Sequence, residues 1–149
     1  MTSEGLIQQR VVVGVDGSAE SVAALGWAAR YAQQAGATVR AVLAWHYPGA
    51  VGGPPIEVSP LRHETERQMQ DRLGEAVAQV YPGPAQGDVE AKVSYGHPAE
   101  VLIGESRDAD LLVVGHRGHG GFPGMHLGSV SIHCVNHSEC PVTVVRTKT

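Results

Sequence analysis

A glycine-rich segment late in the chain holds the residues whose types and spacing could bind a ligand. Gly115 and Gly118 are followed, after nine intervening residues, by Gly128 and Ser129. Glycine has no Cβ, so its backbone can approach a ligand closely. The unpaired N–H groups and the dipole at a helix start attract anions such as phosphate. The segment therefore favours a phosphate-binding loop, and a flexible surface connection is the alternative.

This segment matches neither of the two common phosphate-binding motifs. Both lysines, Lys92 and Lys148, lie outside it, so no Walker-type GxxxxGK[ST] loop is present. The glycines also fit the dinucleotide fingerprint GxGxxG poorly, and no acidic residue follows at the distance expected for a ribose contact. Arg117 is the only permanent cation of the segment. It is either a phosphate partner or a solvated loop charge.

The helix expected after the loop supplies polar groups at its start. Ser129 and Ser131 can offer hydroxyl groups to a phosphate, and Val130 can offer its N–H group. A plain helix N-cap is the alternative role for Ser129, and one helix start can serve both roles.

Strand and helix signals alternate along the whole chain. Short apolar runs predict strands at residues 10–15, 39–44, 89–95, 111–114 and 142–146. Helical spacing and capping residues predict helices from Ser18 to Gly36, from Ser59 to Val80, over 97–108 and over 128–138. The Pro- and Gly-rich stretch from Tyr47 to Pro60 reads as a loop that could close over a ligand. This alternation predicts an α/β fold, with a parallel sheet covered by helices on both faces.

Two of these strand ends are expected to meet. Ligands of open α/β sheets bind outside the carboxyl ends of the strands, where the strand order reverses. Asp16 follows the first predicted strand, and Gly115 follows the fourth. Asp16 precedes Gly17, so ordinary turn chemistry is its alternative role.

The chain resembles the ATP-binding branch of the universal stress protein family. The glycine spacing matches the nucleotide motif of that family, and residues 11–18, 108–115 and 140–146 are similar to its first, fourth and last strands. The resemblance covers residues 1–149 as one domain. It implies a single doubly wound, five-stranded parallel sheet with helices on both faces, of the adenine nucleotide alpha hydrolase-like type, in the strand order 3-2-1-4-5.

The resemblance also implies a ligand and a site. The ligand is ATP or another adenine nucleotide, with or without Mg²⁺. Asp16 would contact the adenine or ribose side, Gly14 and Val15 would line the same wall, and Ala44 would neighbour the adenine. His116 departs from the small residue that many relatives carry, so it could hinder or reshape the approach of a triphosphate. The full expected set is Gly14, Val15, Asp16, Ala44, Val114, Gly115, Arg117, Gly118, Gly128, Ser129, Val130 and Ser131.

The expected function is binding and regulation in a stress response, with weak hydrolysis at most. No GxSxG elbow, HExxH motif or Walker lysine marks a catalytic centre. A slow ATPase on the same fold, and a dimeric stress protein that does not bind nucleotides, are the alternatives. Family members commonly pair through the last strand, so a homodimer is expected, and an apolar edge strand of this kind must be covered.

The composition limits which binding partners and which cellular compartment are expected for the protein. The net charge of −4 argues against nucleic acid. No apolar run approaches the roughly 20 residues of a membrane span, and no signal peptide is recognisable, so a cytoplasmic protein is expected. His133 and His137 share one helix face, but Cys134 is rotated away from it. A solvent-facing histidine surface is therefore expected there, rather than a metal site.

Overall fold

The computed structural model describes residues 8–47, 59–117 and 127–147. Its core is a five-stranded sheet in which every neighbouring pair is parallel, in the order β3-β2-β1-β4-β5. The expected fold class and strand order 3-2-1-4-5 are thus confirmed. The strands are β1 (Arg10–Gly14), β2 (Thr38–Trp45), β3 (Val89–Tyr95), β4 (Leu111–Gly115) and β5 (Val142–Val145).

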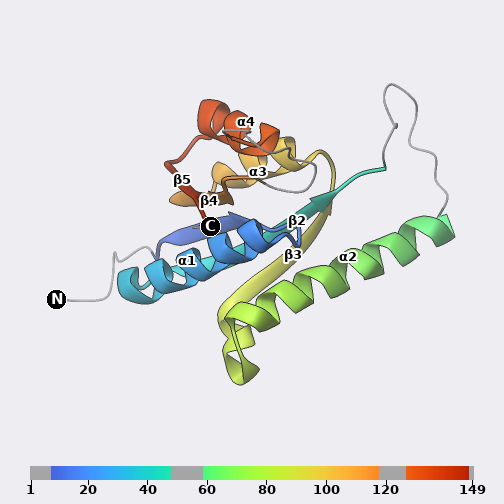
Figure 1. Cartoon of the computed structure of the whole chain (residues 1–149), viewed down its shortest axis with the longest axis horizontal. Helices are drawn as coiled ribbons and strands as arrows, with labels where there is room; N and C mark the ends of the chain where they lie inside the picture. Colours follow the sequence, from blue (N-terminus) through green and yellow to red (C-terminus); the bar gives the residue numbers. More distant parts are fainter. Residues whose placement is uncertain (1–7, 48–58, 118–126, 148–149) are drawn as a thin grey trace.

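Helices connect successive strands, as the alternating signals predict (Figure 1). A short 3-10 helix, η1, follows the predicted break at Tyr81 and was not expected. The helix predicted to reach Asp108 ends at Ser106, because the chain then tightens into i→i−3 hydrogen bonds of 3.3 Å. The elements are α1 (Ala19–Ala35), α2 (Ser59–Val80), η1 (Gly83–Asp88), α3 (Pro98–Ser106) and α4 (Ser129–His137).

The capping residues of α1 were predicted correctly. The Ser18 hydroxyl accepts a hydrogen bond from the Ser21 N–H group at 3.2 Å. Gly36 ends the helix with φ of 68°, a left-handed conformation that glycine adopts without a steric penalty. These caps fix where α1 begins, immediately after the turn that follows β1.

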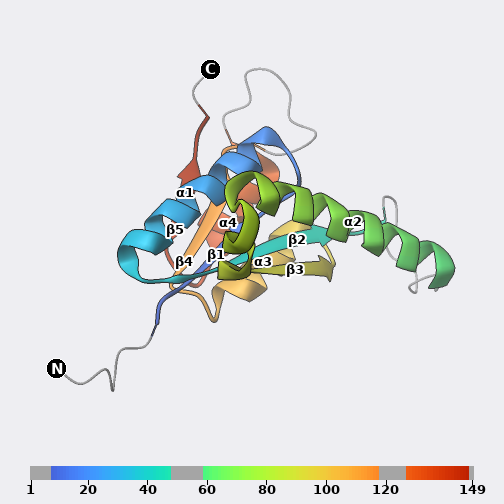
Figure 2. The same ribbon diagram turned by 90° about the horizontal axis from the view of Figure 1, so that it is seen from below.

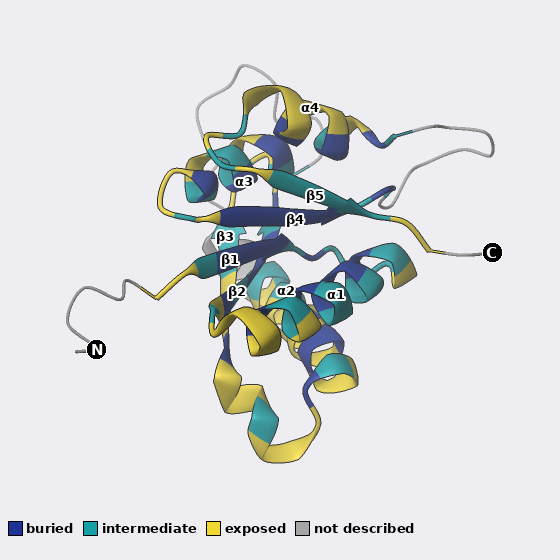
Figure 3. Cartoon of the chain, turned by 90° about the vertical axis from the view of Figure 1, so that its left-hand side faces the viewer, coloured by how far each residue is buried: buried dark blue, intermediate teal, exposed yellow. Residues whose placement is uncertain are grey.

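Helices cover both faces of the sheet, and each face has its own core. In Figure 3, α1 and α2 lie on one side of the strands, and α3 and α4 lie on the other. Figure 2 shows α1 and α2 across the near face. The α1 and α2 side buries Val11, Val13, Leu25, Leu43 and Leu73, among others. The opposite side buries Val12, Val42, Leu102, Leu112, Val114 and Cys134.

The strand β5 has one neighbour, β4, and all four of its residues are half-buried. Val145 packs toward the α1 side, while Val142 and Val144 pack toward α4. Within the described residues, no helix is long and apolar enough to cross a membrane.

Candidate functional site

The turn after β1 is held by hydrogen bonds that fix Asp16. The Asp16 carboxylate accepts the Ser18 N–H group at 2.9 Å, and the Asp16 N–H group donates to the Ser21 hydroxyl at 3.2 Å. Gly17 has φ of 87°, which a side chain would strain. The turn chemistry considered for Asp16 is therefore present, and it positions the carboxylate at the carboxyl end of β1.

The glycine-rich segment begins where β4 ends. The N–H group of His116 donates to the Val145 carbonyl at 2.8 Å, and the His116 carbonyl accepts the Gly128 N–H group at 2.9 Å. His116 is buried, with only 7% of the residue exposed. These bonds bring the two ends of the motif together, Gly115 from β4 and Gly128 before α4. Gly118 lies outside the described residues, as does most of the stretch predicted as a loop from Tyr47 to Pro60.

The start of α4 differs in detail from the prediction. Gly128 is the N-cap and gives no side-chain cap, while Ser129 is the first helical residue and is exposed. The Ser131 hydroxyl is buried and donates to the Gly115 carbonyl at 2.6 Å. It thus ties the motif to α4, because that carbonyl is its nearest acceptor. Helix geometry leaves the first N–H groups of α4 without intrahelical partners.

The remaining predicted residues lie at or next to the carboxyl ends of β1, β2 and β4. Val15 and Val114 are buried, one in each core. A Cβ on Gly14 would lie 2.7 Å from a methyl carbon of Leu102. Ala44 is half-buried and pairs with Ser94, next to the end of β2.

Glu20, in the first turn of α1, was not foreseen and is in contact with the motif. Its carboxylate accepts the Arg117 N–H group at 2.7 Å and lies 3.7 Å from the Arg117 Nε atom. The second distance is an ion pair and not a hydrogen bond. The sequence held one signal for this contact, since Glu20 is the acidic residue that follows the Asp16 turn and Arg117 is the only motif cation.

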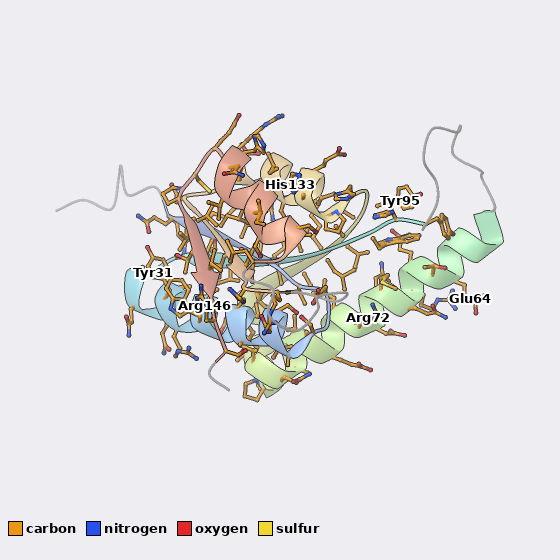
Figure 4. The ribbon with its side chains drawn as sticks, turned by 45° about the horizontal axis from the view of Figure 1, so that its top comes forward. Tyr31, Glu64, Arg72, Tyr95, His133 and Arg146 are labelled. Carbon is orange, nitrogen blue, oxygen red and sulfur yellow. The ribbon has the colours of Figure 1, made fainter. Side chains whose placement is uncertain are left out.

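A second unforeseen residue reaches the Asp16 turn from α2. A Cβ on Gly17 would lie 2.8 Å from the Cδ atom of Arg72, so the Arg72 stem packs directly on the turn. Figure 4 shows Arg72 on α2. No local sequence pattern links residues so far apart.

The histidine face of α4 has an ordinary structural explanation. The Nδ1 atom of His133 hydrogen-bonds with the Ser129 carbonyl at 2.7 Å, and the ring centroids of His133 and His137 lie 6.4 Å apart. Burial raises the pKa of the Cys134 thiol to about 11. Across residues 8–47, 59–117 and 127–147, no group of three His, Cys, Asp or Glu side chains could hold a metal ion.

A charged cluster joins the β2–β3 side of the sheet to α3. Glu105 binds Lys92 and also Arg40, at 2.8 Å, while Arg40 reaches Glu90 at 3.0 Å. Burial alone would raise the pKa of the Glu105 carboxyl, but Lys92 and Arg40 outweigh it and hold that pKa below its usual range. This cluster fastens α3 to the sheet and contains none of the predicted nucleotide-binding residues.

A cavity of about 800 Å³ opens at the amino end of the sheet, between the C-terminal parts of α1 and α2. Arg30, Thr38, Tyr81 and Asp88 are among its lining residues. None of the predicted nucleotide-binding residues that the structure describes lines it. Its position, opposite the carboxyl ends of the strands, separates it from the candidate site.

The chain is similar to universal stress proteins in both sequence and structure. The model of the universal stress protein family matches residues 8–146. A universal stress protein of Mycobacterium tuberculosis is 40% identical over 141 residues, which cover 91% of this chain and 43% of the relative. The chain thus spans less than half the length of that relative.

Solved structures share the fold. A universal stress protein in complex with cAMP has 30% identity and a TM-score of 0.60, with 95% of this chain and 98% of that chain covered. UspA from Lactobacillus plantarum has 22% identity and a TM-score of 0.70, with 93% and 97% covered.

Proposed function

The chain belongs to the universal stress protein family, and we propose from this premise that it binds an adenine nucleotide at the carboxyl ends of β1, β2 and β4. The observation that carries the proposal is that Gly115, Gly128 and the start of α4 meet, and that the motif contacts Glu20 in the first turn of α1, directly after the Asp16 turn. The relative in complex with cAMP, similar over nearly its whole length, supports the choice of an adenine ligand.

Each part of the nucleotide has a proposed partner. The N–H groups of Ser129, Val130 and Ser131 would bind phosphate, because a helix start without a side-chain cap presents them to an anion. Asp16 would accept hydrogen bonds from the ribose or adenine. The backbone of Gly14 and Val15 and the Ala44 side chain would line the adenine. The absence of a Cβ at Gly128 would leave room for the phosphate.

We propose further that nucleotide occupancy is a signal and not a step in rapid turnover. The two carboxylates described at the proposed site each make a structural contact, since one Asp16 oxygen accepts the Ser18 N–H group and Glu20 pairs with Arg117. General acid–base catalysis needs a group held for proton transfer to the reacting atoms. A slow ATPase is the alternative within the same site.

Calorimetry is expected to detect saturable binding of at least one of ATP, ADP, AMP and cAMP, with and without Mg²⁺. ATP hydrolysis measured under the same conditions is expected to stay below about one turnover per minute, far under the roughly 10 s⁻¹ typical of enzymes. No heat beyond dilution with any ligand would rule out the nucleotide site. Turnover at an ordinary enzyme rate would instead favour the ATPase.

We also propose that the chain forms a homodimer through β5. Within the described part of the chain, the half-buried strand β5 pairs with β4 alone, and Ile132 and Val135 on the adjacent α4 are 42% and 50% exposed. An edge strand with apolar residues calls for a covering partner. Light scattering is expected to give twice the chain mass of 15.7 kDa at micromolar concentration. A mass of one chain at every concentration would contradict the dimer.

A further inference from the structure

We infer that Glu20 selects against highly charged phosphate groups, so that the site takes adenine ligands of low negative charge, such as a nucleoside monophosphate or a cyclic phosphodiester, in preference to a triphosphate. This inference rests on the proposed nucleotide site and names the ligand class for it.

The Glu20 carboxylate contacts the glycine motif directly. A phosphate-binding loop works by aiming backbone N–H groups at an anion. Here the Arg117 N–H group donates instead to the Glu20 carboxylate at 2.7 Å. The other carboxylate oxygen lies 3.7 Å from the Arg117 Nε atom. The Glu20 carboxylate thus accepts a backbone N–H group that a phosphate could otherwise use, and it also neutralises the charge of Arg117.

The backbone holds Glu20 in this place. A Cβ on Gly115 would lie 3.1 Å from the backbone carbon and oxygen of Glu20, so the first turn of α1 packs directly on the end of β4. The Ser18 cap fixes the same turn. The Glu20 side chain is 19% exposed, so solvent screens its charge only in part. The Arg117 N–H group and guanidinium hold this carboxylate beside the loop.

Among the described residues, two acidic and two basic side chains lie at the β1–α1 turn and the start of the motif. Asp16 and Glu20 are acidic, while Arg117 and Arg72 are basic. Residues 115–131 contain no lysine and no second arginine. Coulomb repulsion from a carboxylate grows with each negative charge that the ligand brings close to it. A triphosphate therefore meets more repulsion than a ligand with one phosphate group.

The test compares Glu20→Gln with the parent chain by calorimetry in EDTA. The amide oxygen of glutamine can still accept the Arg117 N–H group, so the substitution removes charge and keeps the hydrogen bond. The ATP affinity is expected to rise about tenfold and the adenosine affinity to change less than about twofold, with AMP between them. Glu100→Gln is the matched control, because Glu100 also lies in the first turn of a helix, α3, and is exposed.

The outcomes separate this inference from the proposed function. An unchanged ratio of ATP to adenosine affinity in Glu20→Gln would overturn the inference and leave the nucleotide site standing. An equal loss of both affinities would assign Glu20 a positioning role and overturn it as well. The same gain in Glu100→Gln would show a general charge effect and also count against it. If the parent and both variants bound neither adenosine nor any nucleotide, the proposed function would fail and the inference with it.

Discussion

Replacing Gly128 with glutamate is expected to abolish nucleotide binding, with a loss of affinity of at least about a hundredfold. Gly128 is the N-cap of α4 and has φ of −68° and ψ of 160°, a conformation that any residue can adopt. The new side chain would put bulk and a negative charge at the proposed phosphate position. Calorimetry with the tightest-binding nucleotide measures the effect, and circular dichroism checks the fold.

Two further variants separate the causes of that loss. Gly128→Ala adds a Cβ without charge, so a partial loss of affinity would isolate the contribution of bulk. Gly87→Glu adds the same charged side chain in η1, at the amino end of the sheet, where nothing lies within 4 Å of the new Cβ. The Gly87 variant is expected to bind like the parent. A folded Gly128→Glu variant that bound with the affinity of the parent would exclude the start of α4 as the phosphate position.

The helices and strands could be predicted because the sequence patterns that define them involve residues close together in the chain. The valines of residues 11–13 are fully buried, as a continuous apolar run predicts for a central parallel strand. Ser18 and Gly36 act at the two ends of α1 through contacts within a few residues. The strand order, in contrast, depends on which strands pair across the sheet. It followed from the resemblance to the family and not from the periodicity of the strands.

The site could be predicted only in part, because its contacts cross the sheet. The motif ends and the Asp16 turn were expected at the carboxyl edge, and the structure places them there. Glu20 and Arg72 come from α1 and α2, and their positions result from how these helices pack on the sheet. The Ser131 hydroxyl was predicted as a group that can be offered to phosphate. It faces the Gly115 carbonyl, because the turn of α4 buries it against β4.

These contacts link the β1–α1 turn to the glycine motif. Ser131 fastens α4 to Gly115, and Glu20 fastens α1 to Arg117. A ligand bound at the start of α4 would therefore act on the β1–α1 turn through residues that already touch. Gly115 also lies close to the Glu20 backbone, and this approach can be tested by adding a single methyl group.

Replacing Gly115 with alanine is expected to weaken nucleotide binding about tenfold and to lower the free energy of unfolding by about 1–3 kcal/mol. The added Cβ would lie 3.1 Å from the backbone carbon and oxygen of Glu20. Backbone atoms at a helix start cannot move aside as a flexible side chain can, so the β1–α1 turn and the motif would be pushed apart. Chemical denaturation and calorimetry measure the two effects.

The control for this variant is Gly104→Ala in α3. Nothing lies within 4 Å of a Cβ built on Gly104, which is an exposed helical residue. Alanine there is expected to raise the free energy of unfolding by about 0.5–1 kcal/mol, because glycine is a poor helix former, and to leave binding unchanged. If Gly115→Ala bound nucleotide and unfolded like the parent, the two loops would adjust independently. The coupling between the β1–α1 turn and the glycine motif would then have to be abandoned.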